Sequence, residues 1–281
     1  MWDLLVCPFD HQPLAISQWR WLSCTHCGRG YPVLDGIPRL LPRENQVRWV
    51  RWLNAWAHQA AKSPFAAGVR LDEEDRRDLR QRARQWQRAL GELFAWDFDT
   101  QVLQVSLAGE LLVHHFQWGA RFAVNPLAGF FADRGLLRWG RVRWVHAQPE
   151  QLPFASAAFD LVLLEDVLAW CEWPQAALAQ AARCLKPRGV LCLQWSRPVL
   201  ASRDATASAP AGAARGLRPQ FRQVSAEQLR SWLHQAGLQV GWQWTSAAAA
   251  EGRWQAVWLC GPRQPGKEHP LEQLAGLSFS F

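Results

Sequence analysis

Between residues 99 and 260, short apolar runs of strand length alternate with stretches in which apolar residues recur at helical spacing. This alternation predicts βαβ units, whose strands join a mainly parallel sheet because each helical crossover returns the chain to the same edge. The candidate strands cover residues 102–107, 121–124, 142–146, 161–164, 190–195, 238–244 and 254–260. The sequence therefore predicts an α/β fold built on one seven-stranded sheet.

Other patterns mark the regions on either side of this sheet. Residues 1–42 form a compact cysteine-bearing module, and residues 43–98 form a helical connector in which Pro64 and Gly68 separate two amphipathic helices. Residues 261–281 are rich in proline and predict a loosely ordered tail. A hydrophobic content of 49% with 20% charged residues indicates a globular chain.

Cysteine usage and hydropathy bear on the compartment. No apolar run approaches the roughly 20 residues of a spanning helix, and the first residues lack a basic region followed by an apolar one. Three of the seven cysteines cluster at Cys7, Cys24 and Cys27, which favours metal ligands or buried thiols over a disulfide framework. We therefore expect a cytoplasmic protein without a membrane span.

The formal net charge of +7 is carried mainly by arginine. The arginines crowd one predicted helix and one later loop, at Arg76, Arg77, Arg80, Arg82, Arg84 and Arg88, and at Arg197, Arg203, Arg215, Arg218 and Arg222. Both groups could contact phosphates, so RNA is a candidate partner. The alternative is a solvated helix face paired with the acidic residues between 72 and 78, followed by a flexible loop.

Three motifs downstream of the predicted third strand carry a family resemblance. They are an LPF turn at 152–154, a buried strand opened by Phe159 and Asp160, and an LKPRG run at 185–189. Over residues 99–260 the chain resembles the class I S-adenosylmethionine (SAM) methyltransferases of the ubiquinone-methylase-like type, also called methyltransferase type 11. The resemblance implies a Rossmann-like methyltransferase sheet and SAM as cofactor.

The same resemblance indicates where the cofactor would bind. Such a family places glycines after the first strand, an acid at the end of the second and a carboxylate after the third. The corresponding positions, together with the one glycine left in the turn, are Ser106, Ala108, Gly109, Glu110, Asn125 and Gln148. The amides of Asn125 and Gln148 can still hydrogen-bond a ribose and an adenine, but the lost glycines predict a degenerate SAM site. Alternatively, the turn only closes a strand-to-helix connection.

Residues 3–42 carry a second resemblance. They contain LLVCP at 4–8, a CxxC at 24–27 and YPVLDGIPRLLP at 31–42, and they are similar to the Trm112-like zinc-ribbon family. The resemblance implies one tetrahedral zinc held by two knuckles. Cys7, Cys24 and Cys27 would be ligands, with either Asp10 or His11 as the fourth. Asp10 is favoured because it occupies the knuckle position.

Two functional classes follow. In the first, the chain is a non-catalytic or weakly active methyltransferase-like protein, a pseudoenzyme that serves a protein partner as a scaffold. In the second, it is an active SAM-dependent methyltransferase acting on RNA or a small molecule. Glu165 and Asp166, which follow the predicted fourth strand, are then the candidate general bases.

Overall fold

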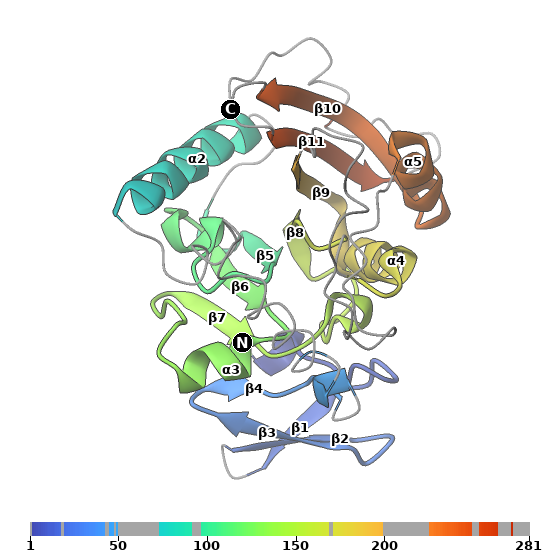
Figure 1. Ribbon diagram of the computed structural model, residues 1–281. Coiled ribbons are helices and arrows are strands. Elements are labelled where there is room, and N and C mark those ends of the chain that lie inside the picture. Colours follow the sequence, from blue (N-terminus) through green and yellow to red (C-terminus); the bar gives the residue numbers. More distant parts are fainter. Residues whose placement is uncertain are drawn as a thin grey trace, which may run out of the picture.

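A computed structural model describes residues 2–17, 20–42, 45–47, 49, 73–91, 97–168, 171–198, 225–248, 253–263 and 271. A seven-stranded sheet runs through its centre in the order β10-β11-β9-β8-β5-β6-β7 (Figure 1). Its strands are β5 (Gln101–Val105), β6 (Ala120–Val124), β7 (Val142–Val145), β8 (Phe159–Glu165), β9 (Leu185–Pro198), β10 (Leu238–Ala248) and β11 (Arg253–Pro262). The predicted α/β sheet is therefore confirmed.

The strands of this sheet differ in direction. β5 to β9 pair in parallel, whereas β11 runs antiparallel to both of its neighbours, β9 and β10. The LKPRG run opens β9, and its extra residues form an irregularity in the pairing with β8, where Phe159 pairs with Leu185 but Leu161 pairs with Val190. This mixed sheet fits the Rossmann-like methyltransferase sheet that the sequence resemblance implies.

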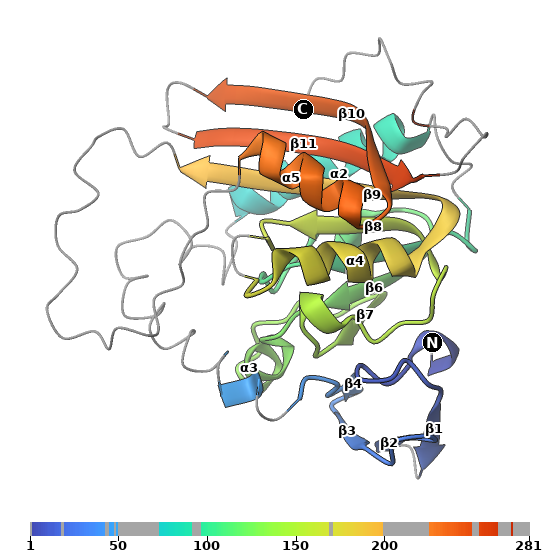
Figure 2. The ribbon, with the colours of Figure 1, turned by 90° about the vertical axis from the view of Figure 1, so that its right-hand side faces the viewer.

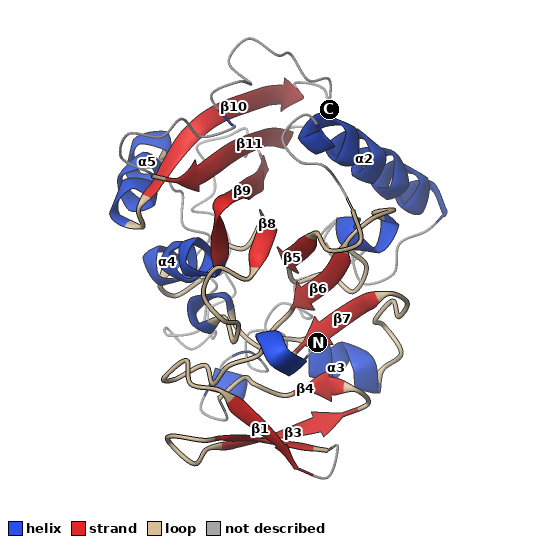
Figure 3. Ribbon diagram, turned by 180° about the vertical axis from the view of Figure 1, so that it is seen from behind, coloured by secondary structure: helices blue, strands red, loops and turns tan. Residues whose placement is uncertain are grey.

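Helices cover both faces of the sheet, as Figure 3 shows. Helices α4 (Pro174–Cys184) and α5 (Ala226–Gln235) pack on one face. Helix α2 (Glu73–Gly91), the 3₁₀ helix η3 (Leu112–His115) and α3 (Ala128–Asp133) pack on the other. Each face therefore has its own hydrophobic cluster. No helix in the described ranges is long and apolar enough to cross a membrane.

Helix α2 is the second predicted helix of the connector. Its apolar positions Leu79, Ala83, Trp86 and Leu90 recur at helical spacing and all are buried. The first predicted helix lies largely outside the described residues, apart from positions 45–47 and 49.

The N-terminal module is a small antiparallel sheet. It contains η1 (Trp2–Leu4), β1 (Leu14–Ser17), β2 (Trp21–Cys24), β3 (Gly30–Leu34) and β4 (Ile37–Pro38). Asp35 and Gly36 join β3 to β4 with φ values of 52° and 74°. Positive φ at both central residues is the type I′ turn that matches the twist of a hairpin, and an Asp-Gly pair adopts it readily.

The module joins the large sheet at the edge formed by β7 (Figure 2). Arg39 bridges in parallel to His146, whose backbone N–H donates to the Pro38 carbonyl at 3.0 Å. A second bridge pairs Leu5 with Phe154. The LPF turn thus contacts the module directly. Most of the module's core residues belong to the same cluster as the face that α4 covers, whereas Ile37 and Leu41 belong to the cluster on the other face.

The predicted tail begins inside the sheet. Positions 261 and 262 belong to β11, and Leu271 is buried against Gly241. A Cβ on Gly241 would lie 2.4 Å from the Leu271 Cβ, so the glycine makes room for this contact. The other residues after 263 lie outside the described residues.

Candidate functional site

The positions that the sequence singled out for a cofactor come together at one edge of the sheet. Because parallel strands all end at the same edge, the residues that follow β5, β6, β7 and β8 meet there. These include Ser106, Asn125 and Gln148, which are buried, and Glu165, the last residue of β8, lies at the same edge. The contacts that each makes decide what this edge can hold.

The turn after β5 packs against the chain's own backbone. A Cβ on Gly109 would lie 2.3 Å from the Leu136 carbonyl oxygen, and the Arg138 N–H donates to the Gly109 carbonyl at 2.9 Å. The only glycine of the turn therefore serves a close approach between two loops. The sequence suggested a helix after this turn, but the structure has only the four-residue η3.

The carboxylate of Glu110 is surrounded by two arginines and a histidine. Its carboxylate accepts from Arg76 Nε at 3.2 Å and contacts His115 Nε2 at 3.1 Å and the Arg138 guanidinium. Burial by itself would raise the pKa of Glu110, but the hydrogen bond from Arg76 and the charge of Arg138 outweigh it and lower that pKa. Arg76 lies on α2, so this ion cluster ties the connector helix to the turn.

Asn125 uses both ends of its amide inside the protein. Its Nδ2 donates to the Ala108 carbonyl at 3.0 Å, and its Oδ1 accepts from the Leu127 N–H at 2.7 Å. The side chain is fully buried. Asn125 therefore braces the turn after β5 against the start of α3.

The side-chain amide of Gln148 also has partners within the protein. Its Nε2 donates to Gln151 Oε1 at 2.9 Å, and its Oε1 lies 3.5 Å from the indole Nε1 of Trp49. Trp49 is buried. Sequence reasoning assigned no role to Trp49, because a contact across 99 residues leaves no local signal.

The candidate bases lie at the end of β8. Glu165 accepts from Gln104 Nε2 at 2.7 Å and lies 4.0 Å from Arg82 Nη1 of α2. Gln104 is fully buried, and its Oε1 accepts from the Val113 N–H at 3.1 Å. Sequence analysis did not identify Gln104 as a site residue, although a lone polar residue inside an apolar strand can indicate one. Asp166 follows with a φ of 53°, a left-handed conformation that aspartate tolerates.

A second cluster lies in the N-terminal module. Cys7, Asp10, Cys24 and Cys27 each offer a ligand atom, and these atoms all lie within 4.8 Å of one another. His11 points elsewhere, toward Gln180 and Arg183 of α4. The structure thus gathers the three cysteines with Asp10 and leaves the alternative fourth ligand outside.

The geometry of this cluster suits a tetrahedral zinc ion. With Zn–S bonds of about 2.3 Å and a Zn–O bond of about 2.1 Å, two sulfurs would lie about 3.8 Å apart and a sulfur and an oxygen about 3.6 Å apart. The Sγ atoms of Cys7 and Cys27 are 3.7 Å apart, and Cys24 Sγ lies 3.4 Å from both Asp10 oxygens. Backbone N–H groups of His26 and Cys27 point at Cys24 Sγ, each at 3.4 Å.

The thiol of Cys7 has a further neighbour. The Tyr31 hydroxyl lies 3.2 Å from its sulfur, and burial raises the pKa of Cys7 to about 11. A zinc ion would favour the thiolate, and the hydroxyl could then donate to it. The donor set therefore fits the metal.

The structure describes the whole of the first arginine group but only one member of the second. Helix α2 presents Arg77, Arg80, Arg84 and Arg88, together with Gln81 and Gln85, along a groove of about 430 Å³. Arg80 pairs with Glu73 at 2.6 Å. In the second group Arg197 lies in β9, and the others lie outside the described residues.

Comparison with known proteins supports the class that the fold suggests. Residues 126–193 match the family of methyltransferase domains. Over 71 residues the chain is 41% identical to the ubiquinone/menaquinone biosynthesis C-methyltransferase UbiE of Idiomarina loihiensis, which is 25% of this chain and 28% of that protein. The chain thus matches little more than a quarter of the length of this relative. The matched family segment begins directly after Asn125, so it excludes the turn after β5.

Solved structures with a similar fold share little sequence. One is the 1,6-didemethyltoxoflavin-N1-methyltransferase of Burkholderia thailandensis, at 18% identity and a TM-score of 0.49 over 85% of this chain and 98% of that one. Another is the N-methyltransferase NodS of Bradyrhizobium japonicum, with 17% identity and a TM-score of 0.49. The match covers 76% of this chain and 100% of that one. A third is in a complex that contains the Haloferax volcanii Trm112 methyltransferase activator, with 16% identity and a TM-score of 0.49. The match covers 70% of this chain and 97% of that one. The sheet order and the matched segment of residues 126–193 are both methyltransferase-like.

Proposed function

We propose that this chain is a methyltransferase-like protein with a degenerate SAM site, which acts as a non-catalytic or weakly active partner protein. The observation that carries this proposal is that the polar groups at the cofactor edge already bind one another. Asn125 is used on both sides of its amide, and Glu110 is held by cations. Both side chains are therefore already engaged inside the protein, and Asn125 is fully buried as well.

Binding SAM would require this edge to change. The methionine carboxylate of SAM would approach Glu110, where like charges repel, and any group that turned toward the ligand would break a buried hydrogen bond. At about 1–3 kcal/mol for each buried group left unpaired, two such losses lower affinity by orders of magnitude. The fold would then be retained for association with a protein partner.

Calorimetry with SAM and with S-adenosylhomocysteine tests this proposal. We expect no binding at micromolar concentrations of protein and ligand. The control variant Ser106→Trp fills the turn, so any weak heat that persists in it arises outside the cofactor edge. Micromolar binding in the unmodified protein that Ser106→Trp abolishes would contradict the proposal.

The competing function is an active SAM-dependent methyltransferase for RNA or a small molecule. It is favoured by Glu165, whose carboxylate lies at the carboxyl end of β8 and is oriented by Gln104. In that case Glu165 would accept a proton from the nucleophile. Transfer of labelled methyl groups from SAM, lost in Glu165→Gln while SAM still binds, would establish this function.

We also propose that the N-terminal module binds one zinc ion through Cys7, Asp10, Cys24 and Cys27. Elemental analysis of the purified protein should give one zinc per chain, and Cys24→Ser should lose it. Asp10→Asn should weaken zinc retention against a chelator, whereas the matched variant His11→Asn should not. Equal zinc loss in both variants would remove Asp10 from the ligand set.

For the cell, we propose a cytoplasmic location. The seven cysteines are all free thiols in the structure, as is usual in a reducing compartment. Fractionation of cells that express the tagged full chain would test this location.

A further inference from the structure

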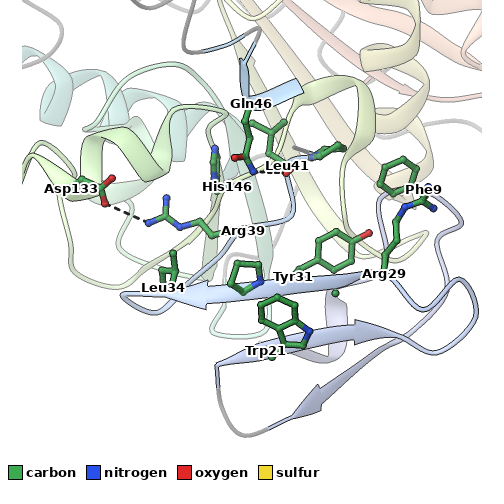
Figure 4. Close-up of a pocket in the computed structure, with 13 residues that line it drawn as sticks. Phe9, Trp21, Arg29, Tyr31, Leu34, Arg39, Leu41, Gln46, Asp133 and His146 are labelled. Carbon is green, nitrogen blue, oxygen red and sulfur yellow. Dashed lines mark hydrogen bonds and ion pairs between the residues drawn. The ribbon is translucent and has the colours of Figure 1, made fainter. Parts of the chain in front are cut away.

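A cleft of about 470 Å³ lies between the N-terminal module and the large sheet (Figure 4). Strands β2 and β3 form one wall, with Trp21 and Tyr31, and the region of α3 and β7 forms the other, with Asp133 and His146. No residue of the turn 106–110 is among those that line it. Its volume is within the range of small-molecule sites.

The charge inside this cleft is poorly balanced. Arg39 is buried, with 9% of its side chain exposed, and its ion pair with Asp133 is 3.9 Å long. Its Nε has no hydrogen-bond partner in the part of the chain that the structure describes. A buried guanidinium normally binds a carboxylate or phosphate closely, and among the described residues Arg39 has only the distant Asp133.

One ring nitrogen of His146, Nδ1, has no hydrogen-bond donor among the described residues. Its Nε2 lies 2.9 Å from the Pro126 carbonyl, so this nitrogen carries the proton. Burial lowers the pKa of His146 to about 4, which keeps the ring neutral and leaves Nδ1 as an acceptor. No described group donates to this buried nitrogen. A hydroxyl or amine on a ligand would do so.

The opposite wall offers an aromatic surface. Trp21 is 42% exposed and lies across Gly30, where a Cβ would come within 2.4 Å of the indole nitrogen. The Arg29 guanidinium stacks 3.7 Å from the centre of the Phe9 ring at the same cleft. An exposed indole beside cationic groups is suited to stacking a flat base.

We propose that this cleft binds a nucleoside monophosphate. The phosphate lies at Arg39, where it displaces the long ion pair with Asp133. The ribose hydroxyls donate to His146 after a small side-chain adjustment, and the base stacks on Trp21. This site is distinct from the cofactor edge.

Calorimetry on the full chain with AMP, adenosine and inorganic phosphate tests the proposal. We expect AMP to bind at least tenfold more tightly than either fragment, because adenosine lacks the phosphate that Arg39 binds and inorganic phosphate lacks the base that stacks on Trp21. UMP should bind comparably, since stacking tolerates any base. Equal affinity for AMP and adenosine would overturn the assignment of Arg39, and the absence of AMP binding at millimolar concentration would overturn the site.

Variants separate this cleft from other surfaces. Arg39→Gln should weaken AMP binding at least tenfold and leave adenosine binding unchanged, whereas Trp21→Leu should weaken both. The controls Arg188→Gln and Trp139→Leu remove exposed side chains that do not line the cleft and should have no effect.

One substitute variant and two further outcomes bear on the site. If Arg39→Gln does not fold, Arg29→Gln is tested in its place, because Arg29 is exposed and its replacement should not disturb folding. Weaker AMP binding in Arg29→Gln supports the site. Loss of AMP binding in Ser106→Trp would place the ligand at the cofactor edge. Binding of single-stranded RNA without binding of AMP would show a polyanion surface. Either result would overturn the proposal.

Discussion

At the scale of single residues, two amides stand where the family resemblance implies acids. Asn125→Asp should destabilise the fold by about 1–3 kcal/mol, because a carboxylate oxygen would replace the donor to the fixed Ala108 carbonyl. Gln148→Glu is the matched control and should cost less, since the partner Gln151 can reverse its own amide. Urea unfolding of both variants measures the difference. Equal losses would show that the rigidity of the partner does not matter.

Glu110 makes stability depend on pH. Its pKa is lowered in the folded protein, so its ion cluster stabilises the fold fully above the ordinary value of 4.5, and this contribution is lost as the pH falls through the lowered value. In Glu110→Gln, unfolding free energy should therefore vary less between pH 6 and about pH 3. Glu227→Gln, at an exposed position of α5, should leave the profile unchanged.

At the scale of elements, α2 is attached by its apolar face and by its ion pairs. Trp86 is 3% exposed within the cluster that contains η3, so Trp86→Ala should destabilise the protein by about 3–5 kcal/mol. Arg84→Ala on the exposed face should change stability by less than about 0.5 kcal/mol. Chemical unfolding compares them. If Trp86→Ala were neutral, burial of Trp86 would not contribute to the attachment of α2.

The exposed face of α2 is where RNA binding would be localised. Arg77, Arg84 and Arg88 form no salt bridge with the acidic side chains that the structure describes, and no base-reading motif accompanies them. We expect binding that is weakly sequence-specific and falls steeply with salt. Replacing all three with Gln should reduce the slope of log K against log salt by about 2. No binding at low salt would leave these arginines as ordinary surface.

At the scale of the whole molecule, the module and the large sheet share one hydrophobic cluster. Cys7 and Cys24 belong to it, as do Phe122 and Phe159 of the sheet. If zinc holds the module, its removal should lower the melting temperature of the entire chain in one cooperative transition. Differential scanning calorimetry with and without a chelator tests this. Two separate transitions would show that the module unfolds independently.

The elements of the large sheet, helix α2 and the gathering of cysteines in the module could all be predicted from the sequence. These follow from local patterns: apolar runs of strand length, the helical spacing of Leu79, Ala83 and Trp86, and the CxxC at 24–27. Burial on a strand or a helix face requires such periodicity, so the pattern can be read without the fold.

The partners of the polar residues, in contrast, are visible only in the tertiary structure. Trp49 reaches Gln148 across 99 positions, and Arg76 of α2 reaches Glu110. The Arg39 side chain enters a cleft because the module adds a bridge at the edge of β7. The sequence identified Asn125 as a polar group near a ligand site, but its two partners come from loops whose meeting depends on the whole sheet. A hydrogen bond between distant segments leaves no periodic trace in the chain, so its presence is decided by the packing of the elements.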